Sequence, residues 1–145
     1  MSFNALSWSE IVTDCKGTGT KEDPVIIEPS EDLPRVIYLR NYNVHIHIRN
    51  LKKRFISLSF CSNIILKDCQ LKYCDVLNCS NIKIDALSIG KLIRLNSSRD
   101  IQIKDSNIGK IKLDQSNSNT IRNCTIKKII NIMSSDNLFE SNTIS

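Results

Sequence analysis

IQIKDSNIGKIKLDQSNSNTIRNCTI, residues 101–126, is the stretch of this sequence that decides the fold. It contains two apolar pairs with the same internal spacing of five residues, Ile103/Ile108 and Ile121/Ile126, and the second pair follows the first after 18 residues. Between the pairs, Ile111-Lys112-Leu113 alternates apolar and polar side chains with the period of two that is typical of a β-strand. The stretch therefore predicts a short repeat built from strands.

The same unit extends through most of the chain. The apolar pairs are Ile46/Leu51, Leu66/Leu71, Ile84/Ile89, Ile103/Ile108, Ile121/Ile126 and Phe139/Ile144. A third apolar position precedes each pair by seven or eight residues, at Leu39, Leu58, Leu77, Leu95, Leu113 and Ile132. Columns that recur every 18–20 residues predict a chain that winds once per repeat, with neighbouring turns about 4.8 Å apart. Helical repeats need about 33 residues or more, so this period argues against them.

Polar bends separate the apolar columns. They lie at residues 61–63, 78–81, 96–100, 116–119 and 134–137 and are rich in Asn, Ser and Asp. These residues suit corners because their short side chains bond nearby backbone and tolerate unusual backbone angles. The sequence thus predicts an all-β parallel solenoid of about six short coils.

The regularity of the coil indicates its hand. Left-handed hexapeptide helices keep a strict 18-residue coil of three equal steps, whereas this repeat drifts between 18 and 20 residues with unequal steps. The drift favours a single right-handed parallel β-helix. A pentapeptide-repeat helix fits the apolar spacing from Ile56 to Val76 but fails at Asn81. One irregularity remains, because Asp75 occupies a slot that holds isoleucine in other coils.

Two segments resemble the repeats of right-handed parallel β-helix proteins of the pectate-lyase-like group: residues 119–126 (NTIRNCTI) and 135–144 (SDNLFESNTI). Residues 17–27 (GTGTKEDPVII) are similar to the segment that often precedes those repeats. The resemblance covers residues 17–145 and implies the fold. It leaves the activity open, because the group contains lyases, hydrolases, epimerases, adhesins and non-catalytic scaffolds.

The N-terminal residues predict a short helix ahead of the solenoid. Ser7-Trp8-Ser9-Glu10 has the spacing of a helix-capping box, and Gly17 supplies a stop, so we expect a helix over residues 8–15. Its expected role is to cover the open first coil, which otherwise presents unpaired backbone to other chains. The chain is accordingly divided into an N-terminal cap helix, residues 1–16, and a β-helix domain, residues 17–145.

Length and composition set the broad class. The chain has 145 residues, 41% apolar and 24% charged, as expected for one globular domain. No apolar run approaches the roughly 18–20 residues that span a bilayer, and the N-terminus lacks the pattern of a secretory signal. We therefore expect a cytoplasmic protein without a membrane span, whose six cysteines are reduced thiols.

The outward positions carry no recognisable catalytic or metal-binding cluster. One outward column reads His47, Lys67, Asp85, Lys104, Arg122 and Glu140, and its neighbour reads Ile48, Asp68, Ala86, Asp105, Asn123 and Ser141. Carboxylates do not fall together on adjacent coils, so the sequence predicts no catalytic residue, metal site or cofactor. We interpret His45 and His47 as surface residues, and the column of Cys61, Cys79, Ser98 and Ser135 as small residues that stack in a corner.

A ladder of lysines is the clearest surface feature of the sequence. It contains Lys53, Lys72, Lys91, Lys110 and Lys128, at intervals of 18 or 19 residues, in a chain of net charge +5. On a solenoid these residues would form one basic ridge whose stacked charges repel each other. The ridge is interpreted either as a solvated corner or as a surface for an acidic polymer, a glycan or a nucleic acid.

The preferred interpretation is a non-catalytic scaffold or binding protein that presents its faces or ends to macromolecular partners. A carbohydrate-active enzyme, or a degenerate relative of one, is the first alternative, and a polyanion-binding module that uses the lysine ladder is the second. The last repeat keeps apolar residues at Ile130, Ile132, Phe139 and Ile144. An open apolar end predicts association, so we expect a homodimer or another protein at the C-terminal coil.

Overall fold

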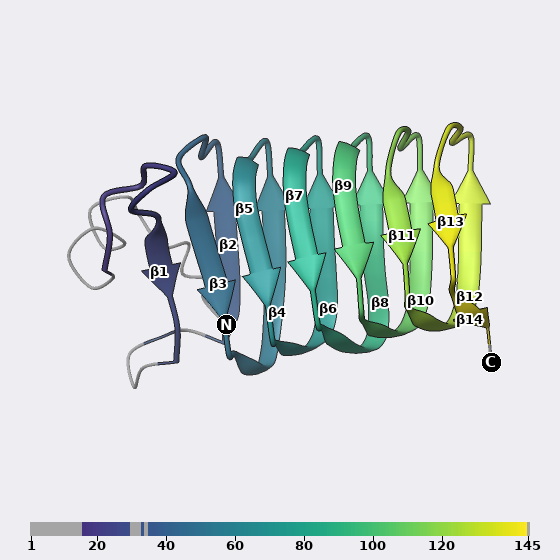
Figure 1. The fold of residues 1–145 in the computed structure, drawn as a ribbon, viewed down its shortest axis with the longest axis horizontal. Coiled ribbons are helices and arrows are strands. Elements are labelled where there is room, and N and C mark those ends of the chain that lie inside the picture. The colour runs from purple at the N-terminus through teal and green to yellow at the C-terminus, as the bar shows by residue number, and fades with distance from the viewer. Residues whose placement is uncertain (1–15, 30–32, 34, 145) are drawn as a thin grey trace.

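The computed structural model describes residues 16–29, 33 and 35–144, and in this part the chain is an all-β parallel solenoid of about six turns (Figure 1). Sheet A contains β1 (Val25–Ile27), β3 (Ile46–Arg49), β5 (Ser62–Lys67), β7 (Ser80–Asp85), β9 (Arg99–Lys104), β11 (Thr120–Arg122) and β13 (Leu138–Glu140). Sheet B contains β2 (Val36–Arg40), β4 (Lys52–Ser59), β6 (Gln70–Leu77), β8 (Ser88–Asn96), β10 (Asn107–Asp114), β12 (Thr125–Ile132) and β14 (Thr143–Ile144).

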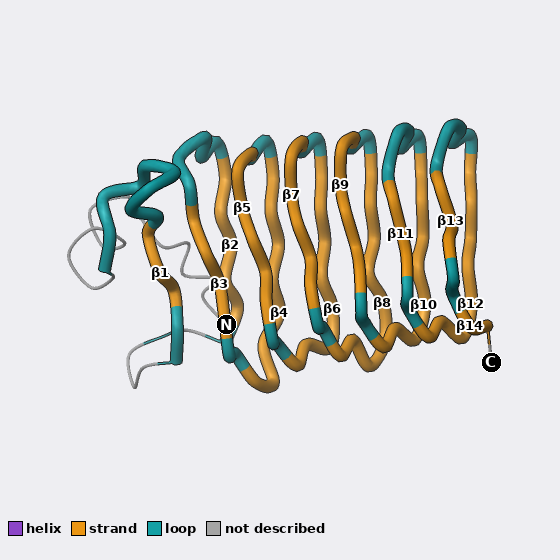
Figure 2. The backbone as a smooth tube through the Cα atoms, in the orientation of Figure 1, coloured by secondary structure: helices purple, strands orange, loops and turns teal. Residues whose placement is uncertain are grey.

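Strands alternate between the two sheets along the chain, so each turn adds one strand to each sheet (Figure 2). The residues that the structure describes contain no helix. The predicted cap helix, residues 8–15, lies outside these residues.

The core consists of apolar columns that run through the space between the sheets. In sheet A, Leu66, Ile84, Ile103, Ile121 and Phe139 stand in register on successive strands. In sheet B, the residues in register are Leu71, Ile89, Ile108, Ile126 and Ile144. The structure therefore confirms the predicted pairs from Leu66/Leu71 to Phe139/Ile144.

The first predicted pair, Ile46/Leu51, is wrong in both members. In sheet A, Ile48 stands in register with Leu66, whereas Ile46 belongs to the column of Ile64. The interval between successive members of the Leu66 column is consequently 18 residues at this step, not 20. Both Ile46 and Ile48 are fully buried, so apolar pattern alone did not distinguish them.

The second member of that pair fails because β4 is irregular. Lys52 pairs with Gln70, but Arg54 is the residue opposite Leu71, and the register shifts between these two pairings. Extra residues in one strand displace everything that follows along it. Leu51 is buried, but it precedes β4 and does not continue the Leu71 column.

The third predicted column contains an error that explains the irregularity at Asp75. Val76, not Leu77, stands in register with Leu58 and Leu95. Cys74 then fills the slot that isoleucine holds in neighbouring coils, and it is fully buried. Since successive side chains of a strand point to opposite faces, Asp75 lies on the outer face.

The corners are left-handed backbone positions occupied mainly by Asn, Asp and Ser, as the polar bends predict. They recur in three columns, residues 41, 60, 78, 97, 115 and 133, residues 50, 68, 86, 105, 123 and 141, and residues 63, 81, 100, 118 and 136. Short polar side chains tolerate this conformation better than most residues. The corners therefore repeat as regularly as the core.

A polar ladder connects the corners at one side of the core. Its members are Cys61, Cys79, Ser98, Ser116 and Ser134. The backbone N–H of each member donates to the side chain of the next, over 2.9–3.4 Å. The structure confirms the stacked corner through Ser98, but its last member is Ser134, where we predicted Ser135.

The segment ahead of the first coil is held by its backbone. Lys16 forms an antiparallel bridge with Ile26 in β1. Gly17 has a φ of 100°, and a Cβ there would collide with the carbonyl oxygen of Pro24, so only glycine fits this position.

The first prediction tests the core columns. Ile103 is fully buried in sheet A, so Ile103→Asp places a carboxylate in an apolar stack and should lower the free energy of unfolding by several kcal/mol. The matched control is Gln102→Asp, at the adjacent exposed position of β9, which should change stability by about 0.5 kcal/mol or less. Denaturant unfolding followed by circular dichroism, with a β-dominated starting spectrum, measures both variants. Equal stability of Ile103→Asp and the parent would contradict the column assignment.

Candidate functional site

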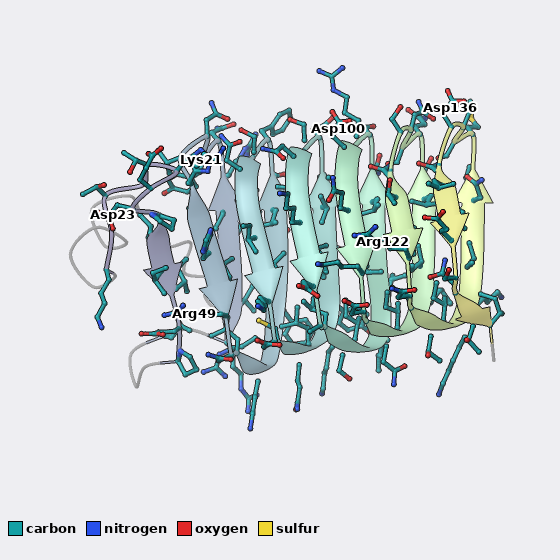
Figure 3. All side chains as sticks on the ribbon, in the orientation of Figure 1. Lys21, Asp23, Arg49, Asp100, Arg122 and Asp136 are labelled. Atoms are coloured by element: carbon teal, nitrogen blue, oxygen red, sulfur yellow. The ribbon has the colours of Figure 1, made fainter. Side chains whose placement is uncertain are left out.

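The outer face of sheet A carries a cation-rich groove of about 450 Å³. Its lining includes the cationic side chains Arg49, Lys67, Lys83, Lys104 and Arg122, together with His47, Ile65, Asp85 and Gln102. Figure 3 labels Arg49 and Arg122, which come from β3 and β11, toward opposite ends of the stacked strands. Five cations and one carboxylate therefore line a single surface.

The strand register arranges most of these cations in a row. Arg49, Lys67, Asp85, Lys104 and Arg122 are successive partners on β3, β5, β7, β9 and β11. Neighbouring strands are about 4.8 Å apart, so the row extends over roughly 19 Å along the solenoid axis. Lys83 stands in the adjacent column, which also contains His47, Ile65 and Gln102.

Acidic side chains neutralise only part of this row. Lys104 Nζ lies 3.7 Å from Asp85 Oδ2, and Arg49 Nε lies 3.3 Å from Glu28 Oε2. The other three groove cations, Lys67, Lys83 and Arg122, form no ion pair with any residue that the structure describes. The paired side chains remain partly exposed, where ion pairs are weak and screened by salt. The groove consequently keeps an excess of positive charge.

His47 is the titratable group of the groove whose environment changes its chemistry. Partial burial lowers its pKa, and the neighbouring Arg49 and His45 lower it further because their charge disfavours imidazolium. A neutral imidazole can still donate one hydrogen bond and accept another. An anion in the groove would oppose the effect of Arg49 and favour the protonated form.

The structure does not place the predicted lysine ladder in one continuous column. Lys110 and Lys128 are register partners on β10 and β12. Lys72 and Lys91 lie where the strand registers shift, and Lys91 Nζ sits 5.8 Å from the centre of the Tyr73 ring. The position of the Lys53 side chain is not described. The strand irregularities that separate these residues are invisible in their sequence spacing.

The residues predicted at the C-terminal end divide between two faces. Phe139 and Ile144 continue inward core columns, and they are 37% and 57% exposed. Ile130 and Ile132 instead stand beside Lys112 and Asp114, on the outer face of sheet B. Asn131 takes the inward position that Ile132 was expected to fill, opposite Leu113. The prediction of Ile132 in the third column is therefore wrong, because it is one residue out of register.

No cluster suited to a metal ion is found within the described residues, where no group of three His, Cys, Asp or Glu side chains is suitably placed. Burial raises the pKa of the Cys69, Cys74 and Cys124 thiols. A hydrogen bond between Cys61 and Cys79 lowers the pKa of Cys61 and raises that of Cys79. Over the same described part of the chain, no helix is long and apolar enough to cross a membrane.

Sequence reasoning came close to the groove without identifying it. The predicted outward column already contained Lys67, Asp85, Lys104 and Arg122, but it was inspected only for carboxylates. Its first member was His47, where the structure places Arg49. A search for cations at intervals of 18 or 19 residues on this face would have found the row.

In comparisons with protein families, with curated proteins and with solved structures, no match to this chain is found.

Proposed function

We propose that this chain is a non-catalytic binding module that holds a linear acidic glycan along the outer face of sheet A. The observation that carries the proposal is the groove itself, in which five cations from five successive strands face one carboxylate. A surface lined by one sign of charge concentrates ligands of the opposite sign. A ligand that contacts the whole row must extend over about 19 Å, which favours a polymer.

The character of the other lining residues supports a glycan over a nucleic acid. Surfaces that bind single-stranded nucleic acids usually combine cations with aromatic side chains on which bases stack. The groove is lined by no Phe, Tyr or Trp among the described residues. Its uncharged polar members, His47 and Gln102, supply hydrogen bonds that suit hydroxyl groups.

We further infer that the scaffold is a right-handed β-helix of the pectate-lyase-like type. Connections between parallel strands of one sheet are right-handed in about 98% of cases. The coil length, which alternates between 18 and 19 residues in the main columns, and the repeats at residues 119–126 and 135–144 support the same assignment.

The second prediction tests the groove against the lysine ladder. Replacing Lys67, Lys83 and Arg122 together with Gln removes three unpaired cations and should sharply reduce retention on heparin. The matched control replaces Lys72, Lys91 and Lys110 with Gln, which removes the same charge from the ladder and should leave retention near that of the parent. Each lost contact should also make the dependence of log K on log salt shallower, by roughly 0.7–0.9 if the glycan behaves as nucleic acids do.

Affinity chromatography and titrations with heparin, polyuronate and single-stranded DNA measure these differences. A larger loss in the ladder variant would move the site to the ladder. Preference for single-stranded DNA over both glycans would contradict the proposed polymer.

The third prediction uses His47 as a reporter of occupancy. A bound anion should raise the pKa of His47, because negative charge stabilises imidazolium. By linkage, affinity should increase as the pH falls through the range between the pKa of the free protein and that of the complex. Nuclear magnetic resonance titration of the imidazole, with and without a heparin oligosaccharide, measures the shift. A pKa unchanged at saturation would contradict binding beside His47, and the Lys67/Lys83/Arg122 variant provides the control.

A second proposal concerns self-association at the last coil. Phe139 and Ile144 occupy columns whose preceding members, Ile121 and Ile126, are fully buried. Leu138 and Met133 on the same coil are 51% and 81% exposed. β13 and β14 are the last strands of their sheets. A second copy related by a two-fold axis would cover these side chains and pair the strand edges.

The fourth prediction tests this end. Phe139→Lys with Ile144→Lys places charges in the inward columns and should convert a dimer to a monomer. Ile132→Lys is the control, since that residue stands in register with Asp114 on the outer face, and it should leave association intact. Analytical ultracentrifugation at micromolar concentration measures both. A parent protein that is monomeric throughout that range would overturn the proposal.

A further inference from the structure

An apolar pit lies on the outer face of sheet B, on the other side of the solenoid from the cationic groove. Its lining is Val36, Tyr38, Phe55, Ile56, Ser57, Tyr73 and Asp75, from β2, β4 and β6. Its volume of about 600 Å³ is within the range of roughly 300–1,000 Å³ that is usual for small-molecule sites. The proposed glycan groove involves none of these residues.

The strand register shows how the pit arises. One outer column contains Val36, Phe55 and Tyr73, and the rings of Phe55 and Tyr73 stack at 5.4 Å with an angle of 13° between their planes. The parallel column contains Tyr38, Ser57 and Asp75. Serine is much smaller than its neighbours, so this column has a gap at Ser57.

The gap has the dimensions of one aromatic ring. Tyr38 and Asp75 are two strand spacings apart, about 9–10 Å, with only the Ser57 side chain between them. A planar ring inserted there would stack on Tyr38 within the roughly 4.5–7 Å typical of aromatic pairs. It would also contact Phe55 in the adjacent column.

Charges beside the pit restrict what the ring carries. Lys91 Nζ lies 5.8 Å from the centre of the Tyr73 ring, and Arg94 Nη2 donates to Asp75 Oδ2 at 3.0 Å. Arg94 therefore compensates the Asp75 carboxylate. An ammonium ligand would meet two fixed cations, whereas an anionic substituent would be attracted by them.

Asp75 also supplies a directional contact. Its Oδ2 accepts from Arg94, and Oδ1 has no hydrogen-bond partner among the residues that the structure describes. A ring with an N–H group on its edge would donate to this oxygen. The pit thus combines a stacking surface, an acceptor and nearby positive charge.

We propose that this pit binds a free mononucleotide. The base occupies the gap at Ser57 and stacks on Tyr38, an N–H group of the base donates to Asp75, and the phosphate lies toward Lys91 and Arg94. The site is a ligand-binding function separate from the proposed glycan groove, because its residues and its sheet are different.

Calorimetric titration of the full chain with AMP, GMP, CMP and UMP tests the proposal. At least one nucleotide should bind saturably, more tightly than its nucleoside, and should shift the ring resonances of Tyr38 and Tyr73. Ser57→Phe fills the gap with a ring of the protein itself and should weaken binding at least tenfold. Ser88→Phe makes the same change at an exposed position of β8 outside the pit and should bind like the parent.

Tyr38→Ala is a second test that adds no bulk, and it should weaken nucleotide binding through loss of stacking. Circular dichroism checks that each variant keeps the fold. Absence of saturable nucleotide binding by the parent would overturn the proposal. So would equal affinity for Ser57→Phe, stronger binding of a trimethylammonium compound or a neutral disaccharide, or a change of oligomeric state in Ser57→Phe that assigns the pit to a second copy. Glycan binding by the Lys67/Lys83/Arg122 variant is measured independently, so the two proposals fail separately.

Discussion

The structure depends on one constraint, the in-register stacking of parallel strands at about 4.8 Å. Each residue lies beside the equivalent residue of the next coil, so any property that recurs becomes a column. Inside the solenoid this is favourable, because apolar side chains such as Ile84 and Ile103 bury each other. It also requires that polar backbone groups at the corners find partners in every coil.

Corner side chains meet that requirement by bonding from one coil to the next. Asn119 is buried, and its Oδ1 accepts from the N–H of Ile101 at 2.9 Å while its Nδ2 donates to the carbonyl of Ser98 at 3.3 Å. Ser116 performs the same task in the parallel ladder, with acceptance from Ser98 and donation to Asp114. The corners are thus held by side-chain hydrogen bonds as firmly as the core is held by packing.

On the outer faces the same stacking has a cost when the recurring residue is charged. Sheet A reduces the repulsion by placing Asp85 between Lys67 and Lys104, yet it retains a net positive row. Sheet B separates its lysines at register shifts and places Lys91 over Tyr73. The two faces of one solenoid therefore present different surfaces, a polar cationic groove and an apolar pit.

The sequence by itself determined the coil, because 18–19-residue recurrence of apolar residues admits few architectures, and it determined most core columns and the polar corners. Tertiary structure alone decided the register at Ile48, Val76 and Asn131, since a strand irregularity or a one-residue change in coil length leaves composition unchanged but moves each side chain to the other face. It also decided the sites. Arg49 joins the cationic row, and Ser57 opens a gap between Tyr38 and Asp75, only when separate coils are brought into contact.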